Sequence, residues 1–410
     1  MHQKNSAPPG DTARVPAPPT AAEAPPALAP LVSKLPRVGT TIFSVMSALA
    51  AEHDAVNLGQ GFPDFDCDPR LIDAVNEAMR NGFNQYPLMA GAPPLRQAIA
   101  NKIAYLYGGK YDPDQEITVT AGATQAILTA VLCCVHPGDE VIVIEPIYDS
   151  YLPAIALAGG KPVPVQMTLG ENGYSIPWDE VSAAITPKTR LLILNSPNNP
   201  TGMVLGEDDI ARLTDILRGT QVMLLSDEVY EHIVYDERRH ESVCRHPELA
   251  SRAFVVSSFG KTYHVTGWKV GYVAAPAMLT AEFRRVHQFN VFTVNAPMQH
   301  GLAAYMQDPA PYLDLAPFYE HKRDLFREGL ARTRFRLLPA PGTYFQCVDY
   351  RKVSDLPEEA FCRWLTTDIG VAAIPMSAFH DQPRESGIIR FCFAKRDQTL
   401  KTALERLSKL

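Results

Sequence analysis

Two lysines, eight positions apart, are the first candidates for chemistry in this chain. They lie in SSFGKTYHVTGWKVGY, residues 257–272, where Lys261 follows the apolar run 254–256 and Lys269 precedes another apolar run. A buried lysine near other cations has a lowered pKa, and its neutral amine is a nucleophile that forms Schiff bases. The segment therefore predicts a reactive lysine with a second cation close by.

Polar residues follow several apolar runs at the point where each run ends. AGAT follows 117–120, NSPNNPTG follows 191–194, SDEVY follows 222–225 and SFGK follows 254–257. Continuous apolar strands separated by helices predict a mainly parallel sheet with both faces covered, and the carboxyl ends of its strands meet at one edge. The residues expected to form a single site there are Gly122, Asn199, Asp227, Tyr230, Ser258 and Lys261.

These residue types together describe one cofactor. The small residues of AGATQAI open a helix whose free N–H groups suit a phosphate, although neither a Walker loop nor GxGxxG is present. A buried Asp227 needs a cationic or hydrogen-bonding partner, and Lys261 offers an amine to an aldehyde. A phosphate, a cationic ring nitrogen and an aldehyde are the features of pyridoxal 5′-phosphate. Each motif alone has a plainer interpretation: a helix cap for Asp227, a Pro-Gly turn for NNPTG and a solvated loop lysine for SFGK.

The elements that must position this site follow from hydrophobic patterning. Helices are expected over 124–134 and 207–217, and further strands over 141–144 and 270–275. DPRLIDAVNEAM predicts another helix, capped by Asp68. Its apolar face comprises Leu71, Ile72, Val75 and Met79.

Four segments are predicted along the chain. Residues 1–36 are rich in Pro and Ala and cannot bury enough apolar surface to fold, which predicts a disordered tail. Residues 37–65 are expected to join a small domain, residues 66–305 to form a large cofactor-binding domain, and residues 306–410 to form the small α+β domain. The last segment contains the strand-like stretches LLPAPGTYFQCVDY and SGIIRFCFAK.

The composition sets limits on partners and location. The 410 residues are 46 % hydrophobic and 20 % charged, and the formal charge is 38 − 45 = −7. A negative balance argues against nucleic acid or an anionic membrane, and no apolar run reaches the roughly 18 residues of a membrane span. The seven cysteines include no CxxC, so free thiols in a reducing compartment, the cytoplasm, are expected. His240, Cys244 and His246 lack zinc-ligand spacing, so no metal is expected.

The chain resembles the class I/II aminotransferases, pyridoxal-phosphate enzymes of fold type I with an α/β large domain and a smaller domain. NNPTG, SDEVY and SSFGKTYHVTGWKVGY stand in that family's order and rough spacing, and the resemblance runs from about residue 34 to the end. The methionine and kynurenine/glutamine aminotransferase branch is the most similar. Its marks are VNLGQGFPDF (56–65), NQYPLMAGAPPLRQAIA (84–100), EPIYDSY (145–151) and GVAAIPMSAF (370–379).

The resemblance implies roles around the cofactor ring. Lys261 would form the internal aldimine and move the proton between the substrate Cα and the cofactor's C4′. Asp227 would keep the ring nitrogen protonated, which makes the ring an electron sink. Asn199 and Tyr230 would hydrogen-bond the 3′ oxygen, and Tyr148 would stack on the ring.

The resemblance also implies how the phosphate is held. The residues expected around it are Gly122, Ala123, Thr124, Ser258 and Lys269. Lys269 stands where the aspartate aminotransferase branch carries arginine, so we expect a point charge in place of a planar fork. Tyr86 resembles the tyrosine that reaches the phosphate of the neighbouring subunit, which implies a homodimer with shared sites.

Arg390 matches the family's arginine for the substrate α-carboxylate. An arginine between Ile389 and Phe391 in an apolar strand needs an anion, and an internal ion pair is the alternative. Asn199 is also expected near this carboxylate, and Gly61 against the substrate backbone.

The expected donor is methionine or an aromatic L-amino acid, and the expected acceptor is a 2-oxo acid, in a ping-pong reaction. The segment 288–299, expected to face the partner's site, has no Arg or Lys for a distal carboxylate. Phe43, Phe62, Tyr148 and Phe292 indicate an apolar substrate pocket instead. Hydrophobic pockets discriminate weakly among apolar side chains, so several donors should react.

Two other functions fit the same residues. A β-lyase acting on cysteine conjugates or cystathionine shares the early chemistry and releases ammonia and pyruvate. A non-enzymatic regulator on the same fold would carry a DNA-binding domain, for which the first 36 residues offer no helix-turn-helix.

Overall fold

The computed structural model describes residues 30–382 and 384–410. Every helix and strand described below belongs to one compact unit, Leu35–Leu410. The disordered tail predicted over residues 1–36 lies, for residues 1–29, outside the described residues.

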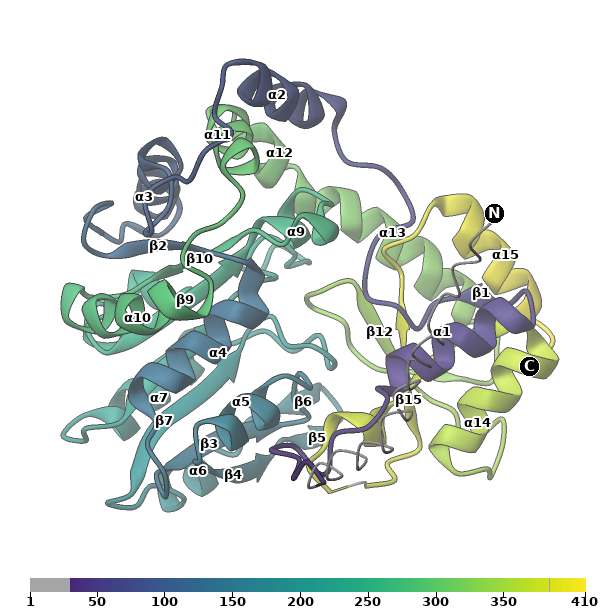
Figure 1. The fold of residues 1–410 in the computed structure, drawn as a ribbon. Helices are drawn as coiled ribbons and strands as arrows, with labels where there is room; N and C mark the ends of the chain where they lie inside the picture. The colour runs from purple at the N-terminus through teal and green to yellow at the C-terminus, as the bar shows by residue number, and fades with distance from the viewer. Residues whose placement is uncertain (1–29, 383) are drawn as a thin grey trace, which may run out of the picture. The chain divides into compact units, whose positions relative to one another are not determined.

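A seven-stranded sheet, ordered β2-β10-β9-β8-β7-β3-β4, forms the larger part of this unit (Figure 1). Only β10 runs antiparallel to its neighbours, so the prediction of a mainly parallel sheet is confirmed. The strands are β2 (Ile117–Thr120), β3 (Glu140–Glu145), β4 (Lys161–Gln166), β7 (Thr189–Asn195), β8 (Met223–Asp227), β9 (Ala253–Ser258) and β10 (Gly271–Ala274).

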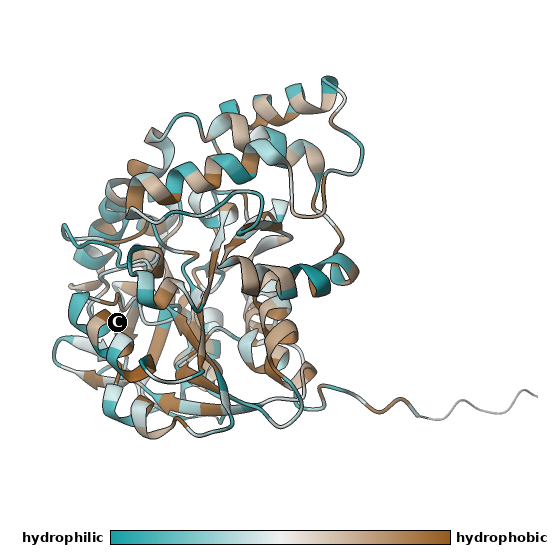
Figure 2. Cartoon of the chain, turned by 90° about the vertical axis from the view of Figure 1, so that its left-hand side faces the viewer, coloured by the Kyte–Doolittle hydropathy of each residue, from teal (hydrophilic) through white to brown (hydrophobic). Residues whose placement is uncertain are grey.

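The apolar runs are continuous because helices cover both faces of this sheet. Along β7, Leu192 and Leu194 belong to one buried cluster, whereas Leu191 and Ile193 belong to another on the opposite face. The first cluster includes residues of α3 (Pro93–Tyr107) and α7 (Glu207–Leu217), and the second includes residues of α4 (Gly122–Cys134), α5 (Tyr151–Leu157) and α10 (Ala277–Asn290). In Figure 2 the strands are largely hydrophobic, whereas the helices carry both hydrophilic and hydrophobic segments.

One strand of this sheet was not predicted. The edge strand β4 reads KPVPVQ and pairs only with β3. Pro162 and Pro164 have no N–H to donate and occur in sheets chiefly at edges, where one side of the strand needs no partner. Because β4 contains two prolines and is partly exposed, it has no continuous apolar run and was not predicted as a strand.

The helix predicted from Asp68 is confirmed, but its apolar face is only half buried. α2 (Pro69–Arg80) begins where expected, with the Asp68 carboxylate accepting the Arg70 N–H at 2.8 Å. Leu71 and Val75 are buried, and α2 packs on α11 (Ala296–Tyr305). Ile72 and Met79 are each 43 % exposed, because they lie at the margins of the stripe that faces α11.

A second, antiparallel sheet holds the C-terminal strands. Its order is β11-β12-β15-β14, which confirms the two strand-like stretches predicted near the end of the chain. The strands are β11 (Arg336–Leu337), β12 (Phe345–Asp349), β14 (Ile374–Pro375) and β15 (Ile388–Cys392). Separately, β1 (Val56–Asn57) pairs in parallel with β13 (Val371–Ala372). The helices around these strands are α1 (Ile42–Glu52), α13 (Leu315–Leu330), α14 (Glu358–Trp364) and α15 (Asp397–Leu407) (Figure 1).

No helix within the described ranges combines the length and the apolarity that crossing a membrane requires.

Candidate active site

A cavity of about 300 Å³ lies at the carboxyl ends of β2, β7, β8 and β9 and reaches Phe345 and Arg390 of the second sheet. Nearly all predicted site residues line it, as expected for strand ends that share one edge. These residues are Phe43, Gly61, Gly122, Ala123, Thr124, Tyr148, Asn199, Asp227, Tyr230, Ser258, Lys261, Lys269 and Arg390.

Tyr86 and Phe292, which were both predicted to contribute to an active site, do not line this cavity. Tyr86 is 83 % exposed and its ring meets the edge of Phe292, with 5.4 Å between the ring centres. Both aromatic side chains lie beside a different depression, lined by 84–87 and 293–297, so this chain alone does not bring them to the site.

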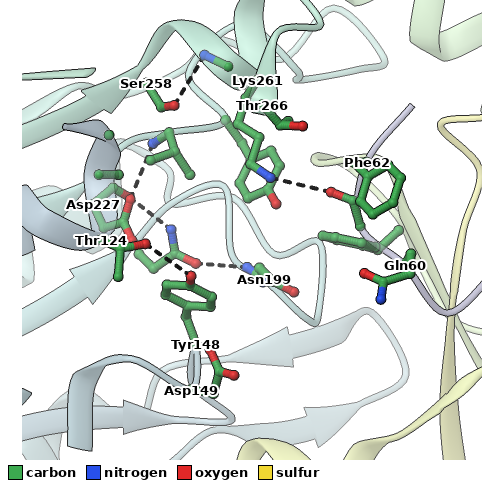
Figure 3. Close-up of a pocket in the computed structure, with 18 of the residues that line it drawn as sticks. Gln60, Phe62, Thr124, Tyr148, Asp149, Asn199, Asp227, Ser258, Lys261 and Thr266 are labelled. Atoms are coloured by element: carbon green, nitrogen blue, oxygen red, sulfur yellow. Dashed lines mark hydrogen bonds between the residues drawn. The ribbon is translucent and has the colours of Figure 1, made fainter. Parts of the chain in front are cut away.

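Lys261 has the environment expected of a reactive amine. It lies on the short helix α9 (Phe259–Thr262) directly after β9, and its Nζ donates to the Gly61 carbonyl at 3.3 Å (Figure 3). The Nζ is 5.7 Å from the ring centres of both Tyr230 and Tyr344. Burial lowers the pKa of Lys261 to about 8, and the charge of Arg390 acts in the same direction.

Asp227 ends β8 and is 3 % exposed. Its Oδ2 accepts the Tyr151 hydroxyl at 2.7 Å, and its Oδ1 accepts the Val229 N–H at 3.4 Å. Burial nevertheless raises the pKa of Asp227 to about 6. A protonated ring nitrogen next to this carboxylate would supply the positive charge that it lacks.

Tyr151 was missed at the sequence level. The stretch EPIYDSY contains it three residues after Tyr148, at the start of α5, where both rings contact each other edge to face with 5.8 Å between centres. A tyrosine that follows another by about one helical turn is a signal that could have found it.

The start of α4 offers an anion site. Its first turn contains no acidic residue, and no side chain caps its N–H groups. Gly122 has φ +77°, and a Cβ there would lie 3.3 Å from the Nζ of Lys269, so the lysine approaches the backbone closely. The Ser258 hydroxyl accepts the Gly260 N–H at 3.2 Å and lines the same wall. A phosphate fits these donors.

Arg390 is a buried cation without an anion. It is 1 % exposed, its guanidinium donates to Asn199 Oδ1 at 2.6 Å and to the Gly59 carbonyl at 3.0 Å, and its Nε has no partner. The guanidinium lies 3.9 Å from the ring centre of Phe345 and 5.4 Å from that of Phe43. No carboxylate among the described residues forms a salt bridge with Arg390, so the internal ion pair has no partner there. A substrate carboxylate suits this position.

Residues 60–62 follow Gly59, whose carbonyl accepts from Arg390. Two residues that were not predicted from the sequence hold this loop in place. Lys395 donates to the Phe62 carbonyl at 2.7 Å and to the Gln60 carbonyl at 3.3 Å, and Tyr344 donates to the Gly61 carbonyl at 2.7 Å. Phe62, which was predicted as part of the apolar substrate pocket, also lines the cavity. Further lining residues that were not predicted include Gln60, Asp149, Asn195, Thr266 and Phe345.

Asn195 ties two strand ends together. Its amide donates to the Asp227 carbonyl at 2.8 Å, and its Oδ1 accepts the Asn199 N–H at 2.8 Å. The NNPTG loop is therefore fixed to the end of β8, which places Asn199 beside Arg390.

The segment after β8 also contains Glu231, which is buried and does not line the cavity. Glu231 accepts Lys102 Nζ and the Tyr107 hydroxyl, both at 2.6 Å, and also the Ser257 hydroxyl. Burial alone would raise the pKa of Glu231, but Lys102 holds it well below its ordinary value. This network does not line the cavity.

Within the part of the chain that the structure describes, no three His, Cys, Asp or Glu side chains gather in a way that could hold a metal ion. His240, which was considered as a ligand, lies 3.0 Å from the Glu228 carboxylate.

Comparison with known proteins adds independent findings. The family model for "Aminotransferase class I and II" matches residues 53–407. Methionine aminotransferase of Escherichia coli (strain K12) is 50 % identical, over 92 % of this chain and 98 % of the relative. Human kynurenine–oxoglutarate transaminase 1 is 34 % identical, over 88 % of this chain and 93 % of the relative. The solved structure of N-succinyldiaminopimelate aminotransferase from Mycobacterium tuberculosis has a TM-score of 0.89 at 42 % identity and covers 93 % of this chain and 100 % of its own.

Proposed function

Because the chain belongs to the class I and II aminotransferases, we propose that it transfers the amino group of methionine, and of other apolar or aromatic L-amino acids, to a 2-oxo acid. The observation that carries the proposal is Arg390, a buried and unpaired guanidinium beside Phe43 and Phe345. One end of the cavity thus suits the α-carboxylate of a substrate, and its aromatic wall suits an apolar side chain. The relative that is 50 % identical is named for methionine.

Enzymes of this family use pyridoxal 5′-phosphate, which supplies an aldehyde that captures amino groups and a cationic ring that withdraws electrons from the substrate. Lys261 would hold the aldehyde and Asp227 the ring nitrogen. Asn199 and Tyr230 would face the ring's phenolic oxygen, and Tyr148 its plane. The phosphate would be held by Gly122, Ala123, Thr124, Ser258 and Lys269.

The side chains then divide the work of the reaction. Arg390 and Asn199 orient the substrate through its carboxylate, which places the Cα hydrogen near Lys261. With a pKa of about 8, the Lys261 amine both accepts and donates a proton near neutral pH. Two half-reactions follow each other in the same cavity, first with the amino acid and then with the 2-oxo acid, which gives ping-pong kinetics.

The proposal includes a homodimer with shared sites. Tyr86 and Phe292 are 83 % and 41 % exposed in the single chain, and Ile72 and Met79 add exposed apolar surface nearby in sequence. In the dimer, Tyr86 would reach the phosphate in the neighbouring subunit. Large apolar side chains exposed together favour burial against a partner.

The domain division and the location are also proposals. The separate buried clusters of the two sheets support a large domain over 66–305 and a small one over 306–410. The pairing of β1 with β13 supports the assignment of 37–65 to the small domain. All seven cysteines are free, which supports a reducing compartment, the cytoplasm.

The test compares kcat/KM for L-methionine and L-aspartate with a common 2-oxo acid acceptor. We expect methionine to react faster, because the cavity offers aromatic side chains to an apolar donor. Faster turnover of aspartate would contradict the proposed donor. Ammonia released in proportion to substrate consumed would identify a β-lyase instead.

A further inference from the structure

Five charged side chains line the active-site cavity, and one of them has no part in the function proposed above. The five are Asp149, Asp227, Lys261, Lys269 and Arg390. Under the proposed function, Asp227 faces a ring nitrogen, Lys269 a phosphate, Lys261 an aldehyde and Arg390 a substrate carboxylate. Among the described lining residues, Asp149 is therefore the charge without an assigned partner.

Asp149 is a charged residue in the wall of the cavity. It follows Tyr148, below that ring in the same wall of the cavity (Figure 3). It is half-buried, and within the described chain it forms no salt bridge and accepts no hydrogen bond from another residue. Burial raises the pKa of Asp149, whereas the charge of Arg390 opposes the rise. The positive charge of Arg390 favours the charged form of Asp149.

We propose that Asp149 is a specificity-determining residue that makes the cavity reject substrates with a second carboxylate. This inference rests on the proposed function, in which the α-carboxylate neutralises Arg390. Once Arg390, Lys269 and Lys261 are engaged by the α-carboxylate, the phosphate and the aldehyde, no cation among the described lining residues remains for a distal carboxylate, and Asp149 repels it. In a partly desolvated site, one such like-charge contact lowers reactivity by about tenfold or more.

Asp149 also acts in the second half-reaction. The acceptor enters the same cavity with its carboxylate on Arg390, so a dicarboxylic 2-oxo acid also meets Asp149. The preferred acceptor is therefore a monocarboxylic 2-oxo acid with an apolar side chain, such as the 2-oxo acid formed from methionine.

The test uses the holoenzyme and its Asp149→Asn and Asp149→Glu variants. The measured quantity is the ratio of kcat/KM for L-glutamate to that for L-methionine, each from the half-reaction without acceptor. Asp149→Asn raises this ratio by about tenfold, whereas Asp149→Glu, which keeps the charge, leaves it near the wild-type ratio. If Asp149→Asn still converts methionine and the glutamate-to-methionine ratio of kcat/KM is unchanged, the proposed role of Asp149 is wrong. The proposed function is then unaffected. A wild-type enzyme that converts neither amino acid overturns the proposed function instead.

A binding measurement gives a readout independent of turnover. Hexanoate and adipate have the same chain length and differ by one distal carboxylate, and both compete with substrate for Arg390. In wild type, adipate binds more weakly than hexanoate, and Asp149→Asn narrows the ratio of their Kd values by about tenfold. An unchanged ratio contradicts the proposal. If the Asn variant does not fold, Asp149→Ser removes the charge with a smaller side chain and is judged by the same ratio.

Discussion

Asp227 and Glu231 lie four residues apart, both are nearly inaccessible to solvent, and their environments are opposite. Glu231 faces the core, where Lys102 gives it a cation and Tyr107 a further hydrogen bond. Asp227 faces the cavity, where Tyr151 is the one side-chain donor to it among the described residues. The pKa of Glu231 accordingly falls below its ordinary value, whereas burial raises that of Asp227 to about 6.

The difference separates a structural carboxylate from a functional one. A buried acid whose counter-charge is built into the chain holds elements together, here α3 with the segment after β8. A buried acid that lacks such a charge is ready to accept a cationic ligand. The same short segment, SDEVYE, supplies both, because Asp227 and Tyr230 point to the cavity while Glu231 points away from it.

The largest expected effect comes from breaking the structural pair. Lys102→Met leaves Glu231 buried without its cation, so the free energy of unfolding falls by about 3–5 kcal/mol. Urea denaturation of the apoprotein measures it, and Lys110→Met, at an exposed lysine, is the matched control. A loss below about 1 kcal/mol would mean that the pair does not stabilise the fold.

The two carboxylates should give the stability of the apoprotein opposite pH dependences. The pKa of Asp227 is raised from 3.8 to about 6, so its contribution is fully present below pH 3.8 and is lost as the pH rises through 6. Wild type should thus lose about 3 kcal/mol relative to Asp227→Asn between pH 4 and 7. The pKa of Glu231 is lowered, so its contribution is present above 4.5 and is lost as the pH falls.

Urea denaturation across this pH range compares wild type with Asp227→Asn and Glu231→Gln. For each variant, the difference in the free energy of unfolding from wild type is plotted against pH. Equal slopes of the two plots would show that Asp227 and Glu231 have the same kind of environment.

The smallest expected effect comes from removing one hydroxyl on each side. Tyr151→Phe deletes a donor to Asp227 and should lower kcat/KM for methionine by about tenfold, because hydrogen bonds to charged groups contribute about 1.5–3 kcal/mol. Tyr107→Phe deletes a donor to Glu231 and should lower the free energy of unfolding by about 2 kcal/mol. If Tyr107→Phe reduced kcat/KM as much as Tyr151→Phe, the environments of Glu231 and Asp227 would not be functionally distinct.

The sequence predicted the central strands and most of the lining residues for a physical reason. Parallel strands covered on both faces must be continuously apolar, and their carboxyl ends share an edge, so polar residues after 117–120, 191–194, 222–225 and 254–257 meet. These relations depend on sequence order alone, and they did not need the details of packing.

The remaining features depend on how elements pack, which periodicity does not specify. The hydrophobic pattern of α2 predicted that Ile72 and Met79 would be buried in the same way as Leu71. The position of α11 decides which of these side chains is buried, and the pattern does not specify that position. Tyr151 and Asp149 stand in a loop-to-helix junction, where one residue of shift changes which side chain faces the cavity.

The most direct test of the central claim is an absorption spectrum of the purified holoenzyme before and after adding L-methionine without acceptor. We predict that the long-wavelength band of the bound cofactor is replaced by a band at shorter wavelength, and that Lys261→Ala does not show this change. A band that methionine leaves unaltered would contradict the proposed donor. No band, even after incubation with pyridoxal 5′-phosphate, would contradict the assignment of Lys261 and its neighbours to this cofactor.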